Sequence, residues 1–234
     1  VNVLMMSQGF GAGARIQTSG EIEAAEKFLG VEPPDGFTIV DVGANRGEYS
    51  IAISKKYPNS RVVAFEPSKL IFGNLSNNVK SYSQIVPYNL GLGQTISERK
   101  LYKESELSKI SSLTKLDITK ERFTETVRIQ SLDELASDFQ LLNIDLMKID
   151  VEGHEMEVII GAQESIKKGL IRCIQFEIGG SSIDTGTSFR SIYLFLSEMG
   201  YSIYLIKPRG VQKIQEHEYF FEHYSTTNYF AVFE

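Results

Sequence analysis

The segment LMKIDVEGHEMEV, residues 146–158, places many charged side chains directly after a strand-like apolar run. Lys148 and Asp150 are two positions apart, so in a strand their side chains share one face. Glu152 and His154 follow within four residues. Histidine titrates near neutral pH, which makes it the usual general base for an alcohol nucleophile. We predict that His154 is a catalytic base and that Glu152 or Asp150 orients it.

The charged residues of this segment could also have structural roles instead of catalytic ones. A buried ammonium must be paired, and Glu177, at the end of the next predicted strand, is the candidate partner of Lys148. Glu155 and Glu157 fall in the first turn of a predicted helix, where the helix dipole favours carboxylates and we expect them to be solvated. In the alternative interpretation of His154, this residue only begins that helix.

Carboxylates in this region could also bind a metal ion. Asp150, Glu152 and Glu177 together offer oxygen ligands of the kind that divalent cations prefer. The sequence contains no motif with metal-ligand spacing around them, so we predict no metal ligand.

A second candidate site is the segment IVDVGANRGEYS, which has the pattern of a strand, a loop and a helix. Gly43 and Gly47 bracket the turn, and Asn45, a residue that tolerates positive φ, stands between them where a G-x-G-x-G loop would have a further glycine. Asp41 precedes the loop, where its carboxylate could meet an ammonium group. About 20 residues beyond the loop, the next strand ends at Glu66, which could accept hydrogen bonds from both ribose hydroxyls. These features predict a site for an adenosine cofactor.

The type of cofactor follows from the start of the helix. A dinucleotide fingerprint needs a third glycine where this chain has Glu48, and an acidic side chain at a helix start suits a pyrophosphate poorly. S-adenosylmethionine contains adenosine without phosphate, so we predict this cofactor. The alternatives are an NAD(P)-dependent oxidoreductase and a non-catalytic cofactor-binding or scaffold protein.

The elements that must position these residues alternate along the chain. Apolar runs of strand length occupy residues 37–44, 61–67, 83–92, 144–151, 171–178, 201–207 and 227–234. Helical patterns separate most of them, which predicts a doubly wound α/β fold with a largely parallel sheet. The last two runs are joined by a polar segment without a convincing helix, so we expect them to be antiparallel.

We predict one domain over residues 31–234, preceded by a mobile segment and a helix within residues 1–30 that could act as a lid. In that helix, Ser19 is the expected N-cap and Gly30 the expected end. Ser131 and Glu134 form a capping-box pattern at another helix. The polar stretch 94–130 contains two strand-like pieces and is expected to form a hairpin-like excursion near the acceptor site.

Composition limits the classes of partner. The 234 residues have a formal net charge of −6 and no basic cluster, which disfavours nucleic acid and anionic membranes as partners. No apolar run reaches the roughly 18 residues of a membrane span, and no signal peptide is recognisable, so we expect a cytoplasmic location. The single cysteine, Cys173, lies in an apolar run and is expected in the core. The oligomeric state stays open.

Six segments, in this order, resemble those of FkbM-type methyltransferases: VDVGANRGEYS, AFEPS, PYNLGLG, SLDEL, LMKIDVEGHEMEVIIGA and IQFEI. The resemblance covers about residues 37–180. It implies a Rossmann-like class I methyltransferase fold: a seven-stranded, mostly parallel sheet with the last strand antiparallel and helices on both faces. It also implies S-adenosylmethionine-dependent O-methylation of a hydroxyl on a small-molecule or glycan acceptor, such as a sugar, glycoside or polyketide.

The same resemblance implies which residues bind the cofactor. The loop after the first strand would hold the methionine part, the second strand end the ribose, the third the adenine, and the fourth would face the sulfonium. In that order, the implied residues are Asp41, Gly43, Ala44, Asn45, Gly47, Tyr49 and Ser50; Glu66, Pro67 and Ser68; Asn89; and Asp150.

Overall fold

The computed structural model describes residues 9, 18–103, 111–115, 123–136, 141 and 143–234. The predicted mobile N-terminal segment, apart from Gly9 and residues 18–20, lies outside the described residues. The parts of the excursion at 104–110 and 116–122 lie outside them as well.

The main sheet has eight strands in the order β11-β10-β12-β9-β8-β1-β2-β3. The five strands from β9 to β3 are parallel to one another, and β12 is antiparallel to both β9 and β10. In chain order the bounds are β1 Thr38–Val42, β2 Arg61–Phe65, β3 Ile85–Tyr88, β8 Ile144–Ile149, β9 Ile171–Ile178, β10 Tyr201–Lys207, β11 Gly210–Lys213 and β12 Thr227–Phe233. The predicted fold class and the antiparallel last strand are confirmed.

The sheet contains one strand more than the seven expected. The additional strand, β11, forms a hairpin with β10 through a turn that ends at Gly210, which has φ 98°. A side chain would strain this backbone, so glycine suits the position. The strand is short, polar and mostly exposed at the sheet edge, which explains why hydrophobic patterning does not predict it.

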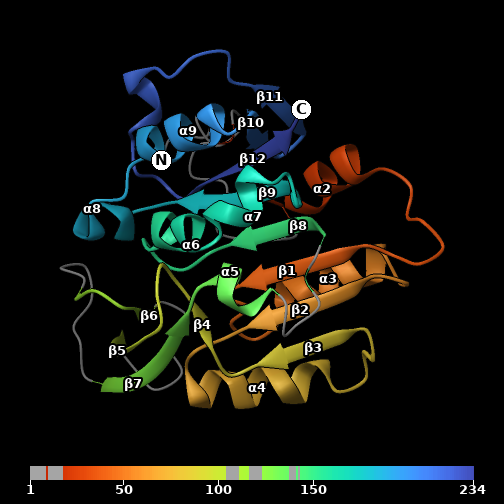
Figure 1. Ribbon diagram of the computed structural model, residues 1–234, viewed down its shortest axis with the longest axis vertical. Helices are drawn as coiled ribbons and strands as arrows, with labels where there is room; N and C mark the ends of the chain where they lie inside the picture. The colour runs from red at the N-terminus through yellow and green to blue at the C-terminus, as the bar shows by residue number, and fades with distance from the viewer. Residues whose placement is uncertain (1–8, 10–17, 104–110, 116–122, 137–140, 142) are drawn as a thin grey trace.

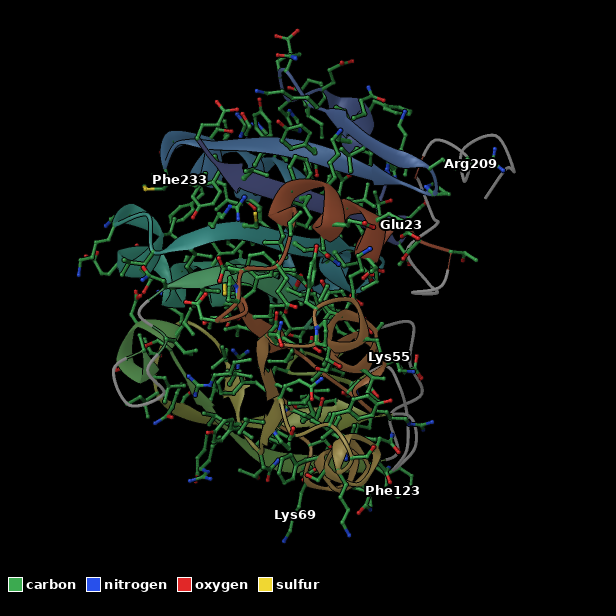
Figure 2. All side chains as sticks on the ribbon, turned by 90° about the vertical axis from the view of Figure 1, so that its right-hand side faces the viewer. Glu23, Lys55, Lys69, Phe123, Arg209 and Phe233 are labelled. Carbon is green, nitrogen blue, oxygen red and sulfur yellow. The ribbon has the colours of Figure 1, made fainter. Side chains whose placement is uncertain are left out.

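Helices cover both faces of the main sheet, as expected. One face packs against α2 (Glu21–Leu29), α3 (Glu48–Lys56) and α4 (Lys69–Val79). The other packs against α5 (Leu132–Leu135), α6 (Glu155–Gly161), α7 (Gln163–Lys167) and α9 (Phe189–Glu198). The short elements α8 (Ser181–Thr185) and η1 (Tyr219–Phe221) complete the fold. Figure 2 shows Glu23 and Lys55 pointing outward from this framework.

The excursion forms a second sheet in the order β4-β7-β5-β6, with bounds β4 Gly91–Leu92, β5 Ser97–Lys103, β6 Ser111–Ser112 and β7 Phe123–Gln130. The predicted hairpin-like pairing is confirmed, because β5 and β7 are antiparallel along their whole length. The arrowheads of β1, β2, β3 and β8 point toward the side on which this sheet lies (Figure 1). The second sheet therefore faces the edge where a doubly wound fold binds its ligands.

The helix ends agree only partly with the predicted caps. The Ser131–Glu134 capping box and the Gly30 terminus of α2 are both present. Ser19 is not the N-cap of α2: Gly20 takes that position with φ 85°, and Ser19 hydrogen-bonds the side chain of Glu21 instead. The helix expected after residue 154 divides at Ala162 into α6 and α7.

Composition predicted that the single cysteine lies in the core and that no segment spans a membrane. Cys173 is fully buried among apolar residues, and burial raises the pKa of its thiol to about 12. Within the described part of the chain, the helices are all too short or too polar to cross a bilayer.

Candidate active site

The largest group of predicted site residues lines one cavity at the carboxyl ends of β1, β2 and β8. This main cavity has a volume of about 660 Å³, including space open to solvent. The predicted site residues that line it are Gly43, Asn45, Glu66, Pro67, Asp150, Glu152 and His154. The second sheet and its connections supply the mostly apolar remainder, including Leu92, Leu101, Leu113 and Ile129.

The glycine loop brings the ends of β1 and β8 into close contact. Gly43 has φ 78°, and a Cβ built on it would lie 1.9 Å from the carbonyl oxygen of Asp150. Asn45 adopts the left-handed conformation expected of it, with φ 50°. Gly47 is the N-cap of α3 with φ 84°. The loop therefore presents backbone, with little side chain, to the cavity.

Replacing Gly43 with alanine is expected to weaken binding of S-adenosylhomocysteine by about 10–100-fold. The left-handed conformation costs about 1–3 kcal/mol for a residue with a side chain, and the Cβ overlaps with Asp150, so the loop must shift and the bound arrangement of its backbone is then no longer the stable one. Titration calorimetry and thermal unfolding would measure both effects. Gly73→Ala in α4 is the matched control, because its Cβ would meet nothing within 4 Å. Equal affinity of the two variants would contradict this role of Gly43.

Glu66 is a buried carboxylate at the end of β2. Its Oε2 accepts a hydrogen bond from the backbone N–H of Asn45 at 3.0 Å, and its Oε1 accepts one from Ser68 at 2.8 Å. Burial raises the pKa of Glu66 to about 7, against the opposing effect of these two donors. The side chain of Asn89 donates to the carbonyl oxygens of Glu66 and Pro67 at 3.0 and 2.9 Å. Asn89 thus supports this strand end and lines a neighbouring hollow.

Six further predicted residues do not line the main cavity: Asp41, Ala44, Gly47, Tyr49, Ser50 and Ser68. Ser50 donates to Asp41 Oδ2 at 2.6 Å, and the Tyr49 hydroxyl donates to Gln175 at 3.1 Å. The ammonium of Lys148 lies 5.3 Å from the centre of the Tyr49 ring. Asp41, Tyr49 and Ser50 thus form a buried polar layer with Lys148 and Gln175 on the α2/α3 face, whereas Ser68 donates to Glu125 of the second sheet.

Lys148 is the cation of that buried layer. Its Nζ lies 3.0 Å from Asp150 Oδ2 and 3.7 Å from Asp41 Oδ1. Burial lowers the pKa of Lys148, but the attraction of Asp150, Asp41 and Glu21 outweighs it, so the pKa lies above its usual value. Lys148 and Asp150 share one face, as predicted. The predicted partner Glu177 is wrong, because the ion pairs of Lys148 are with Asp150 and Asp41.

Glu21 is a buried residue that sequence reasoning missed. It begins α2, and its carboxylate accepts hydrogen bonds from Gln175 at 2.8 Å and Asn228 at 3.1 Å. Burial raises its pKa, and Lys148 opposes that shift. In the sequence Glu21 resembles any acidic residue in a first helical turn, so no local signal marks it.

His154 is 4% exposed and is held at both ring nitrogens. Nδ1 lies 2.8 Å from Glu157 Oε1, and Nε2 lies 3.2 Å from the Thr114 hydroxyl. The other oxygen of Glu157 pairs with Arg99 at 2.5 Å. The prediction that Asp150 or Glu152 orients the ring is wrong, since Glu157 does so. Sequence spacing offered a signal, because His154 is the N-cap of α6 and Glu157 follows three positions later.

The remaining carboxylates of the segment differ from expectation in their burial. Glu155 is buried, not solvated: its Oε1 accepts hydrogen bonds from Val151 and Gly153, and burial raises its pKa to about 7. Glu152 adopts φ 54°, and its carboxylate accepts a hydrogen bond from Ser181 at 3.2 Å. Burial raises the pKa of Glu152 to about 8. Glu157 is partly exposed but paired.

Asp150, Glu152 and Glu177 are the three carboxylates that could offer oxygen ligands to a cation. Burial, followed by the charges of Asp150 and Glu152, raises the pKa of Glu177 well above its usual value. Among the described residues, no group of three or more histidine, cysteine, aspartate or glutamate side chains has an arrangement that could hold a metal ion.

Comparison with known proteins gives consistent matches. The methyltransferase FkbM domain matches residues 41–203. Methyltransferase 1 of Beauveria bassiana is 28% identical over 203 residues, which cover 78% of this chain and 80% of that protein. The hexuronic acid methyltransferase AglP of Haloferax volcanii is 28% identical over 142 residues, covering 60% of this chain and 56% of that protein.

Among solved structures, methyltransferase FkbM from Methylobacillus flagellatus has a similar fold. Its TM-score is 0.56 at 17% identity, and the alignment covers 97% of this chain but 57% of that one. This chain therefore spans little more than half the length of that solved protein.

Proposed function

Because the chain belongs to the FkbM methyltransferase family, we propose that it transfers a methyl group from S-adenosylmethionine to a hydroxyl group. The observation that carries this proposal is the position of His154 on the wall of the cavity that the glycine loop and Glu66 also line. We propose a sugar, glycoside or other small-molecule alcohol as the acceptor. The hexuronic acid methyltransferase among its relatives supports a sugar.

FkbM methyltransferases use S-adenosylmethionine, and the residues of the main cavity fit this cofactor. An ionised carboxylate has about four acceptor sites, and the two backbone donors to Glu66 leave further sites for ribose hydroxyls. The missing Cβ at Gly43 lets the end of β8, with Asp150, lie directly against the loop that lines the cavity. Asp150, whose side chain is partly exposed on the cavity wall, supplies negative charge for a cationic cofactor.

The mechanism assigned to the chain's own residues is general-base assistance. When bound, S-adenosylmethionine supplies a methyl group on a sulfonium sulfur, and the electron pair of the broken S–C bond stays on sulfur. His154 Nε2 accepts the hydroxyl proton as the new O–C bond forms, since a neutral alcohol is a weak nucleophile. Leu101, Leu113 and Ile129 of the second sheet and its connections make the facing wall apolar, which restricts water at the reacting atoms.

Calorimetry would distinguish this function from the two alternatives. Micromolar binding of S-adenosylhomocysteine without NAD binding is the expected result. Binding of NAD would support an oxidoreductase, and binding of neither would support a scaffold protein. A panel of glycosides and polyketide alcohols, assayed for S-adenosylhomocysteine release, would then identify the acceptor. Release that no hydroxyl compound stimulates would contradict O-methylation.

Nucleoside affinity is expected to rise about tenfold between pH 6 and pH 8. The pKa of Glu66 is about 7, and ribose hydroxyls donate to its ionised form, so a bound nucleoside lowers this pKa. The affinity increase therefore accompanies ionisation of Glu66 and levels off above pH 8. 5′-Methylthioadenosine is a suitable probe, since it has the ribose hydroxyls but no titrating amino-acid group. Glu66→Gln should bind more weakly and with a flat profile. An equal pH dependence in both proteins would rule out Glu66 as its source.

A further inference from the structure

The ring of His154 is held by residues from two separate parts of the fold. Glu157 belongs to α6, one turn beyond His154, whereas Arg99 lies on β5 of the second sheet. Arg99 pairs with Glu157 Oε2, and Glu157 Oε1 lies 2.8 Å from His154 Nδ1. The side chains thus form a chain of contacts from the second sheet to the candidate base.

The contacts determine which ring nitrogen bears the proton. The hydrogen bond from His154, together with the nearby charge of Arg99, holds the pKa of Glu157 below its usual value despite burial. Glu157 is therefore an ionised carboxylate near neutral pH, which can only accept hydrogen bonds. The proton of the neutral ring must then reside on Nδ1, which leaves the lone pair on Nε2.

The contact at Nε2 shows what that lone pair can do. The Thr114 hydroxyl lies 3.2 Å from Nε2 and donates to it in this tautomer. The acceptor hydroxyl would take the place of the Thr114 hydroxyl at this single lone pair, with the same hydrogen-bond geometry. This arrangement of an acid, an imidazole and a hydroxyl follows the general pattern in which a third group orients a base.

We infer that Glu157 and Arg99 are positioning residues that fix His154 as its Nδ1–H tautomer and direct Nε2 toward the acceptor hydroxyl. The inference rests on the proposed function, because methyl transfer to a hydroxyl is the reaction that needs a base at this position. Glu157 also stabilises the protonated ring after it has taken the proton. Arg99 holds the carboxylate and limits how strongly Glu157 attracts that proton.

The other two histidines provide internal controls. His217 Nε2 lies 2.9 Å from Glu222, so its proton is on Nε2. His223 Nδ1 accepts a hydrogen bond from the backbone N–H of Ser225 at 3.1 Å, so its proton is on Nε2 as well. The chain has three histidines, and His154 should differ from the other two in tautomer.

NMR of the full chain labelled with ¹⁵N-histidine would test this inference without an acceptor. At pH 8.5, two-bond ¹H–¹⁵N correlations should show one Nδ1–H ring and two Nε2–H rings. His154→Asn would assign the distinct ring, because its signals would disappear. Three Nε2–H rings in the wild-type chain would overturn the inference.

The same correlations test each positioning residue. Glu157→Gln replaces a group that can only accept with an amide that can also donate, so the share of the Nδ1–H tautomer of His154 should fall. Arg99→Met releases Glu157 from the second sheet, so this share should also fall, but by less. Asp150, Glu152 and Glu66 also line the cavity that His154 faces, and both variants retain them. A purely structural role of Glu157 and Arg99 would leave the tautomer of His154 unchanged.

Two matched controls lie outside the site. Glu164→Gln changes an exposed glutamate that pairs with Lys167 on α7, and Lys100→Met removes a charge from the exposed side of β5. Both should leave the tautomers of the three histidines unchanged. An unchanged tautomer share of His154 in both Glu157→Gln and Arg99→Met would overturn the inference. If the tautomer pattern holds but no hydroxyl is methylated, the proposed function fails while the positioning geometry stands.

Discussion

Replacing His154 with alanine is expected to lower turnover by about 10²–10⁴-fold, the range that general-base assistance contributes. Affinity for S-adenosylhomocysteine should not change, because Glu66 and the glycine loop remain intact. Turnover should fall because Nε2 is the proposed proton acceptor, and the hydrogen bonds of the ring are with Thr114 and Glu157, which cannot replace it. Turnover is measured as S-adenosylhomocysteine release with the acceptor found by the hydroxyl panel, and affinity by calorimetry.

Added imidazole should restore part of the lost turnover of His154→Ala, since the substitution leaves a space the size of the missing ring. His154→Asn, which keeps a donor for Glu157 but has no base, should be as slow as the alanine variant. His217→Ala is the control, because His217 pairs with Glu222 and does not line the main cavity. Wild-type turnover in His154→Ala would remove the base assignment.

Local patterns in the sequence were enough to predict the parallel strands of the main sheet and the glycine loop after β1. The glycine and asparagine positions of the loop follow from the backbone conformations they must adopt, and those conformations are observed. Strand ends place Gly43, Glu66 and Asp150 at one edge because parallel strands of a doubly wound sheet share that edge. This part of the site depends on neighbours in sequence and on the fold class alone.

The partners of the charged groups were not predictable in the same way. Glu21 contacts Gln175 and Asn228 across 154 and 207 residues, and hydrophobic patterning contains no information on such pairs. Arg99 reaches Glu157 from a sheet that only tertiary packing brings to α6. Glu155 was expected to be solvated because first-turn carboxylates usually are, but here the loop folds over it: two backbone N–H groups donate to Oε1, and the buried Oε2 accepts no hydrogen bond from the described residues.

Lys148 is another charged group whose partners come from tertiary packing, and these ion pairs make it important for stability. Replacing Lys148 with methionine is expected to lower the free energy of unfolding by about 3–5 kcal/mol, as when one partner of a buried ion pair is removed. Asp41 is fully buried, and its Oδ1 accepts no hydrogen bond from the described residues, so Lys148 is the charge that stabilises it. Urea titration would measure the loss, with Lys167→Met as an exposed control expected to change little.

The pH dependence of the stability of Lys148→Met would show whether the buried carboxylate of Asp41 causes the loss. Burial already raises the pKa of Asp41 despite the opposing charge of Lys148, and the loss of that charge would raise it further. A raised pKa in the folded state means that stability is retained below the unfolded pKa and lost as pH rises through the folded one. Lys148→Met should therefore be more damaging at pH 8 than at pH 5, and adding Asp41→Asn should recover much of the loss at pH 8. If the double variant is no more stable than Lys148→Met, packing around the lysine stem and the Tyr49 ring, not the orphaned charge, accounts for the effect.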